Sequence, residues 1–121
     1  MISSYKDLKV YQRSYKLAMT IFNLCANFPK EEKYSLTSQI IRSYRSISAN
    51  ISEGWAKREY ENIFKQHLIH SLGSASETQT WLSFSLDCKY ISEVEFEKLN
   101  KEVDEICMMI TKLHQRWKSN L

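Results

Sequence analysis

Apolar residues recur every three or four positions along four long stretches of this chain, and this spacing puts them on one side of an α-helix. Strands and tight turns use glycine and proline, and the chain has only two glycines and one proline in 121 residues. Few turns can therefore be built. The sequence predicts an all-α fold, an antiparallel up-down-up-down four-helix bundle, formed as one domain over residues 1–121.

The first predicted helix stops before Pro29, because the residue that precedes a proline disfavours helical geometry. The apolar surface of this predicted helix is wider than one seam of the bundle needs. The predicted inward stripe is Leu8, Tyr11, Tyr15, Ala18, Phe22 and Cys25. A second apolar stripe flanks the first and consists of Val10, Leu17, Ile21 and Leu24.

The second predicted helix begins between Glu32 and Ser35 and ends near Gly54, where a glycine can supply a left-handed turn. A short polar connection follows at residues 57–59. The predicted inward residues are Leu36, Ile40, Ile47 and Ile51, with Ser43 and Asn50 at the intervening positions of the stripe.

The third predicted helix covers residues 61–88. Gly73, Ser74, Ala75 and Ser76 form a patch of small residues in its middle. Glycine there costs about 1 kcal/mol relative to alanine, so we expect a neighbouring helix to approach closely at this patch. The predicted inward residues are Phe64, Leu68, Ala75, Leu82 and Leu86.

The fourth predicted helix starts with a capping box, in which Ser92 and Glu95 each satisfy a free backbone amide of the first turn. Its inward stripe is then regular: Phe96, Leu99, Val103, Ile106, Ile110, Leu113 and Trp117.

Several functional classes find no support in the residues. No run of eighteen apolar residues and no secretory signal is present, so we expect a cytoplasmic protein without a membrane span. Cys25, Cys88 and Cys107 form no CxxC pair and are interpreted as buried thiols of a reducing compartment.

Catalytic and metal-binding motifs are also missing from the sequence. No Glu-x-x-His motif, no glycine-rich phosphate loop and no serine with a local histidine base can be found. His67 and His70 are three residues apart, but no carboxylate clearly completes a metal site with them. We predict a protein that is not an enzyme and holds no metal or cofactor.

Basic residues give the stronger functional signal. The net charge is +3, and residues 1–60 carry ten Lys and Arg against five Asp and Glu. Aromatic residues lie among these cations in sequence, a mixture that suits RNA or single-stranded DNA, although a merely solvated face is the alternative. The candidate nucleic-acid contacts are Lys9, Arg13, Lys16, Arg42, Arg45, Lys57 and Arg58. The aromatic residues are Tyr5, Tyr11, Tyr44 and Trp55.

The segment from Asn50 to Gly54 has an amide where the stripe calls for an apolar residue, and a buried amide needs partners. Glu53, one turn later, is placed to join such a network. The segment either forms a binding site or fixes the register of the second helix, and the second interpretation is the simpler one.

Apolar residues beyond the four inward stripes predict self-association, because contiguous exposed apolar patches usually mark an interface. Besides the flanking stripe of the first helix, these residues are Trp81, Phe84, Met108 and Met109.

Five segments together resemble the bacterial family of 23S rRNA-intervening sequence proteins, and the similarity covers nearly the whole chain. The most specific is Ser-Ile-Ser-Ala-Asn-Ile-Ser-Glu-Gly at 46–54, which contains Asn50, Glu53 and Gly54. The others lie at 8–12, 28–32, 36–40 and 73–77, the last ending at Glu77. The chain departs from the family pattern at Ser43–Arg45, where small apolar residues are common, and at Ser48, where proline is common.

This resemblance implies a four-helix bundle that assembles as a ring-shaped homopentamer. A relative, the accessory variability protein of diversity-generating retroelements, is similarly pentameric and basic, and it partners nucleic acid and a reverse transcriptase. For most of the family no biochemical function is established.

The sequence therefore leads to one hypothesis and one rival. The hypothesis is a cytoplasmic, non-catalytic homo-oligomer that binds RNA or DNA weakly, mainly through phosphate contacts. The rival is a scaffold that binds another protein and no nucleic acid.

Overall fold

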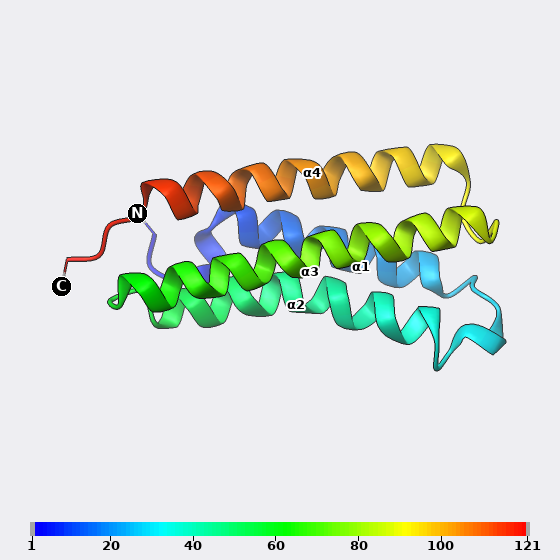
Figure 1. Ribbon diagram of the computed structural model, residues 1–121, viewed down its shortest axis with the longest axis horizontal. Coiled ribbons are helices and arrows are strands. Elements are labelled where there is room, and N and C mark those ends of the chain that lie inside the picture. Colours follow the sequence, from blue (N-terminus) through cyan, green and yellow to red (C-terminus); the bar gives the residue numbers. More distant parts are fainter. Residues whose placement is uncertain (1, 121) are drawn as a thin grey trace.

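The computed structural model describes residues 2–120, and within them it contains helices and no strand. The predicted all-α four-helix bundle is confirmed (Figure 1). The four long helices are α1 (Lys9–Cys25), α2 (Leu36–Ala56), α3 (Glu61–Asp87) and α4 (Glu93–Arg116). Two short 3₁₀ helices, η1 (Tyr5–Asp7) and η2 (Lys30–Glu32), precede α1 and α2.

Consecutive helices run in opposite directions along the bundle (Figure 1). Side-chain contacts between α2 and α3 follow this order: Thr78 Oγ1 lies 2.9 Å from Ser43 Oγ in the first half of α2, and His67 pairs with Asn50 in the second half. Both chain ends therefore lie at the end of the bundle that carries the α2–α3 connection (Figure 1).

The predicted inward face of α1 is correct for Leu8, Ala18 and Cys25 but wrong for Tyr15 and Phe22. The flanking stripe, predicted to be surplus to the core, instead supplies Val10, Leu17 and Ile21 to it. The buried residues are Val10, Ser14, Leu17, Ala18, Ile21 and Cys25. Tyr15 and Phe22 of the predicted stripe are instead 54% and 47% exposed. The buried stripe is hard to recognise in the sequence because it contains the polar residue Ser14. Inside the core the Ser14 hydroxyl is satisfied by Tyr11 O at 2.9 Å and Ser48 Oγ at 3.1 Å.

The inward residues of α2 are as predicted, but its end is not. Leu36, Ile40, Ile47 and Ile51 are buried. The helix continues past Gly54 to Ala56, and no glycine of the described chain has a positive φ. Gly54 is instead buried where α2 meets α3, and a Cβ there would lie 2.7 Å from His67 Cβ. The glycine therefore permits a close helix contact and does not form a turn.

In α3 the predicted bounds are confirmed to within one residue, and Phe64, Leu68, Ala75 and Leu82 are buried while Leu86 is partly buried. The close approach expected at the patch of small residues is made by Ala75, which is fully buried, and by Ser74, whose Oγ donates to Ser46 Oγ of α2 at 2.8 Å. Gly73 takes no part in it, because it is exposed and no described residue lies within 4 Å of the Cβ it would carry.

Hydroxyl side chains interrupt the apolar seam of α3. Ser71, Thr78 and Ser85 are fully buried, and each donates to a backbone carbonyl at 2.8–2.9 Å. Their small size and satisfied hydrogen bonds let α3 pack against α2 without a polar penalty.

The capping box of α4 is confirmed. Ser92 Oγ accepts from Glu95 N at 3.1 Å, and Glu95 Oε1 accepts from Ser92 N at 2.8 Å. The stripe of α4 buries Leu99, Val103, Ile106 and Ile110, and its two ends are partly buried. No helix in the described part of the chain is both long and apolar enough to cross a membrane.

Candidate functional site

The three predicted cations of α1 do not form one free row. Lys9 and Lys16 are exposed. Arg13 lies between α1 and α4, where it binds Glu102 through Nε (2.9 Å) and Nη2 (2.6 Å) and also pairs with Glu105. These hydrogen bonds, first to Glu102 and then to Glu105, raise the pKa of the guanidinium. Arg13 is therefore used to join two helices.

The other predicted cations differ in whether they contact neighbouring side chains. Arg42 and Arg45 are exposed on α2. Lys57 donates to Glu53 at 3.0 Å, and this hydrogen bond holds the pKa of the Glu53 carboxyl below its usual range. Arg58 lies over the Trp55 ring at 4.4 Å and donates to Trp55 O at 2.9 Å.

The predicted aromatic partners of these cations are mostly inside the protein. Tyr44 and Trp55 are 3% and 7% exposed, so their faces cannot stack on a base in this structure. Tyr5 and Tyr11 are partly buried and pack edge to face, with ring centroids 4.8 Å apart.

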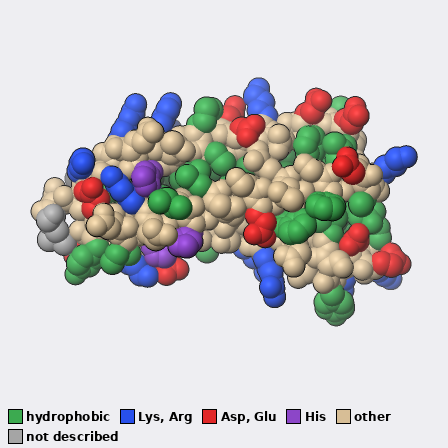
Figure 2. Space-filling view, viewed as in Figure 1, with side chains coloured by type: hydrophobic (Ala, Val, Ile, Leu, Met, Phe, Trp, Pro, Cys, Tyr) green, Lys and Arg blue, Asp and Glu red, His purple; other side chains and the backbone are tan. Residues whose placement is uncertain are grey.

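The folded chain separates charge along the bundle. We call the half made of residues 2–16, 47–74 and 107–120 the basic half, and the half made of residues 17–46 and 75–106 the acidic half. The basic half carries ten Lys and Arg against four Asp and Glu, whereas the acidic half carries seven against ten. Lys and Arg gather toward the end with the chain termini, and Asp and Glu toward the other end (Figure 2). Arg13 of the basic half pairs with Glu102 and Glu105 of the acidic half, and without Arg13 the surplus of the basic half is five. A surplus of this size on one half is a local field that attracts polyanions.

Three cations of the basic half were not among the predicted contacts. Lys112, Arg116 and Lys118 are exposed and lie in or just after the last turns of α4. They belong to the half of the sequence with a deficit of positive charge. The antiparallel order could have revealed them, because it brings the end of the fourth helix beside the beginning of the first.

An apolar groove of about 470 Å³ lies on the outside of the bundle between α1 and α2. Tyr15, Met19 and Phe22 on its α1 side are 54%, 44% and 47% exposed. Arg45 is the one charged residue of its lining. The complete lining is Tyr11, Tyr15, Ala18, Met19, Phe22, Tyr44, Arg45, Ser48, Ala49 and Ser52.

Tyr44 is one of the residues that line this groove, and its hydroxyl is unusual. The hydroxyl is buried and has no hydrogen-bond partner within the described residues. A buried hydroxyl without a partner costs free energy, so it lowers the stability of the fold at this position.

The segment around Asn50 forms a polar contact between α2 and α3. Asn50 Nδ2 donates to Ser46 O at 2.9 Å, which leaves its Oδ1 to accept from His67 Nδ1 at 3.1 Å. Glu53 is exposed, with its Oε2 3.7 Å from His67 Nε2, and Gly54 provides the room for His67. These contacts fit the interpretation that the segment fixes helix register. Glu77 lies elsewhere, exposed on α3, where it accepts from Trp81 Nε1 at 3.2 Å.

Residues with metal-binding or redox chemistry do not converge. Within residues 2–120, no three His, Cys, Asp or Glu side chains are grouped so that they could hold a metal ion. Cys25 is buried and Cys107 partly buried, whereas Cys88, predicted to be buried, is exposed at the end of α3. Burial raises the pKa of the Cys25 thiol to about 11, so this thiol is unreactive at neutral pH.

Comparisons with known proteins identify a family and a similar solved structure. The model of the family described as "23S rRNA-intervening sequence protein" matches residues 6–112. A crystal structure of a protein of unknown function from the S23 ribosomal protein family of Bacteroides thetaiotaomicron is similar to this chain, with 30% sequence identity and a TM-score of 0.79. That similarity covers 88% of this chain and 95% of the other. No curated protein has significant similarity to the chain.

Proposed function

We propose that this chain, which belongs to the 23S rRNA-intervening sequence protein family, is a non-catalytic bundle. In this proposal the protein assembles with copies of itself and binds RNA or DNA. The basic half supplies the nucleic-acid contacts, and the apolar groove supplies part of the assembly contacts. Binding is weak for one subunit and depends on phosphates more than on base sequence.

The observation that carries the nucleic-acid part is the separation of charge between the two halves. Phosphate recognition needs exposed cations without carboxylates beside them, and Lys112 and Arg116 in the last turns of α4 meet that requirement. Lys118 follows α4 and lies near Glu61, whose pKa it helps to lower. Lys112, Arg116 and Lys118 have no ion pair within the described residues. Five of the contacts predicted from sequence lie in the same half, although Arg13 and Lys57 are paired with carboxylates. The five are Lys9, Arg13, Lys16, Lys57 and Arg58.

Assembly strengthens this field. The resemblance implies five subunits, and the surplus positive charge of five basic halves would act together on one polyanion. Exposed Tyr15, Met19 and Phe22 give the assembly its driving force, because apolar side chains on a groove of this size favour removal from water.

Charge reversal tests the proposal with a matched control. The test variant carries Lys112→Glu, Arg116→Glu and Lys118→Glu in the basic half. The control carries Lys89→Glu, Lys98→Glu and Lys101→Glu in the acidic half, so both have the same net charge. Fluorescence anisotropy with a labelled single-stranded RNA, and with DNA of the same sequence, measures affinity over a range of salt concentrations.

We expect the test variant to lose at least about tenfold in affinity and to show a shallower salt dependence, because it makes fewer phosphate contacts. The control should lose much less. Equal losses in both variants would show that only net charge matters, and no binding by the unmodified protein at low salt would refute the nucleic-acid part. Arg13 is left unchanged, because its reversal would break the contact with α4.

The rival function is a scaffold for another protein. The groove favours it, since an apolar groove could take a foreign helix. Purification of the protein with a stoichiometric protein partner and without nucleic acid would support this rival.

A further inference from the structure

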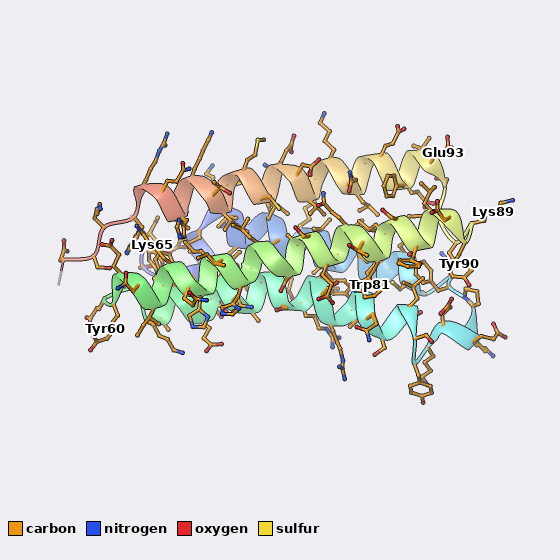
Figure 3. All side chains as sticks on the ribbon, viewed as in Figure 1. Tyr60, Lys65, Trp81, Lys89, Tyr90 and Glu93 are labelled. Atoms are coloured by element: carbon orange, nitrogen blue, oxygen red, sulfur yellow. The ribbon has the colours of Figure 1, made fainter. Side chains whose placement is uncertain are left out.

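One side of α3 carries features that nothing inside the chain explains. Gly73, Glu77, Trp81 and Phe84 follow one another at intervals of four, four and three residues, so they share a face, which we call the α3 stripe. Phe84 is 53% exposed, and its ring lies 5.7 Å from that of Trp81. Trp81 lies on the side of α3 nearest α2 (Figure 3), on a face where hydrophobic side chains gather beside an acidic one (Figure 2).

Gly73 is the second unexplained feature of the α3 stripe. Glycine in the middle of a helix costs about 1 kcal/mol relative to alanine. Such a cost is commonly offset by a neighbour that needs the space, yet none of residues 2–120 places a neighbour within 4 Å of the absent Cβ. The helix surface at Gly73, one turn before Glu77, therefore has a shallow depression between the side chains around it.

We infer that the α1/α2 groove of one copy receives the α3 stripe of a second copy. This inference rests on the proposed self-assembly and names the two surfaces that meet. The groove presents Tyr15, Met19 and Phe22, and the α3 stripe presents the exposed Phe84 beside the partly buried Trp81.

Dimensions agree with this pairing. From Tyr15 to Phe22 the groove extends along seven residues of α1, about 10 Å, and from Glu77 to Phe84 the stripe extends along seven residues of α3, again about 10 Å. Gly73 leaves room for a large side chain from the rim of the groove.

Charge agrees as well. The lining of the groove contains Arg45 and no acidic residue, and the α3 stripe contains Glu77 and no basic residue. Within residues 2–120, neither Arg45 nor Glu77 has an ion-pair partner within 4.0 Å. Contact between copies brings these two unpaired charges to the same interface, and opposite charges fix the register of an apolar contact.

The geometry also determines the kind of assembly. Groove and stripe are different surfaces of one molecule, so their contact is head to tail and leaves a free groove and a free stripe at the two ends of any short assembly. Both surfaces border α2, so each added copy turns the row of subunits toward α2. This curvature favours a closed ring with the outer side of α2 toward the centre.

Mixing two defective variants tests the pairing. The groove variant carries Met19→Lys and Phe22→Lys, and the stripe variant carries Gly73→Lys and Phe84→Lys; all four residues are exposed, so the fold should survive. Circular dichroism checks that survival. In sedimentation velocity we expect each variant alone to be a single subunit. An equimolar mixture should give a two-subunit species and nothing larger, because only one intact groove and one intact stripe can meet.

Two outcomes would overturn this inference alone: a stripe variant that assembles like the unmodified protein, or a mixture that stays at one subunit. An unmodified protein that sediments as one subunit at every accessible concentration would refute the proposed assembly itself. RNA binding by the basic half is measured separately and does not depend on these results.

A charge exchange tests the register. Arg45→Glu and Glu77→Arg should each weaken association about tenfold, and the double variant should recover most of the loss. Arg42 is the matched control, because it is exposed on the same helix and absent from the groove lining. If Arg42→Glu restored the association of the Glu77→Arg variant as well as Arg45→Glu does, that result would contradict the proposed pairing of Arg45 with Glu77.

Discussion

At Gly54 the missing side chain lets α2 and α3 come together near their connection. His67 occupies the space that a side chain would need, and it is held there by Asn50 and packed beside Phe64. The position depends on local volume, since the backbone φ at Gly54 is ordinary for a helix. A methyl group at this position has to displace a ring or separate two helices.

We therefore predict that Gly54→Ala destabilises the protein by about 1–3 kcal/mol, a usual cost of overpacking. Chemical denaturation measures the change. Gly73→Ala is the matched control and should stabilise the subunit by about 0.5–1 kcal/mol, since it meets nothing within the chain. The pair should be compared in the groove variant, where contacts between copies are absent. A stabilising Gly54→Ala would contradict the packing described here.

Arg13 gives a second prediction at the residue scale, one that depends on pH. Its hydrogen bond lowers the pKa of the Glu105 carboxyl in the folded protein. A carboxyl with a lowered folded pKa stabilises the fold above its unfolded pKa, about 4.3, and the contribution is lost as pH falls through the folded value.

Arg13→Met should consequently be less stable than the unmodified protein at pH 7, and the difference should shrink as the pH falls below about 4. Denaturation at pH 7 and pH 3 measures both. A difference that stays constant over this range would show that Arg13 acts by packing, for example against Met109, whose sulfur lies 3.5 Å from Nη1.

At the scale of elements, α1 and α4 differ in how their positions are set. The orientation of α1 depends on a contact with another helix, because Ser14 turns inward to meet Ser48 of α2. The start of α4 depends on its own residues, since Ser92 and Glu95 satisfy the first free amides of the helix. A local signal of this kind can be altered without changing the core.

Ser92→Ala should cost about 1 kcal/mol of stability, because one amide of the first turn loses its acceptor. Ser83→Ala is the control with the same chemical change: Ser83 is exposed in the middle of a helix and only donates to Gln79 O. This control should be nearly neutral. Equal costs in the two variants would mean that the cap contributes nothing of its own.

At the scale of the whole molecule, the two proposed interactions have different physical origins. Attraction of nucleic acid to the basic half is electrostatic, and salt shortens its range from about 10 Å at 0.1 M to about 3 Å at 1 M. The groove and the α3 stripe are mainly apolar, and salt does little to weaken an apolar contact.

Raising the salt concentration from about 0.1 M to about 1 M should therefore release RNA while the assembly stays intact. Anisotropy and sedimentation velocity on the same samples follow both properties. Dissociation of the assembly in step with RNA release would contradict the proposal, since it would mean that charge or the nucleic acid holds the copies together.

The sequence by itself determined the number of helices, their approximate bounds and the inward faces of α2, α3 and α4. These properties depend on neighbouring residues: a stripe of apolar residues at helical spacing, a proline after Phe28, a cap at Ser92. The candidate cations could also be named from sequence, but not their surroundings. Arg13 and Lys57 prove to be paired with carboxylates, the former across 89 residues of chain.

Only the tertiary structure decided which stripe of α1 is buried, which glycine lies at a helix contact and where positive charge gathers. Each of these depends on residues far apart in the chain. Ser14 is acceptable in the core because Ser48 is there, and Gly54 is required because His67 is there. The basic half exists because antiparallel packing brings Lys112, Arg116 and Lys118 to the end of the bundle where Lys9 begins α1.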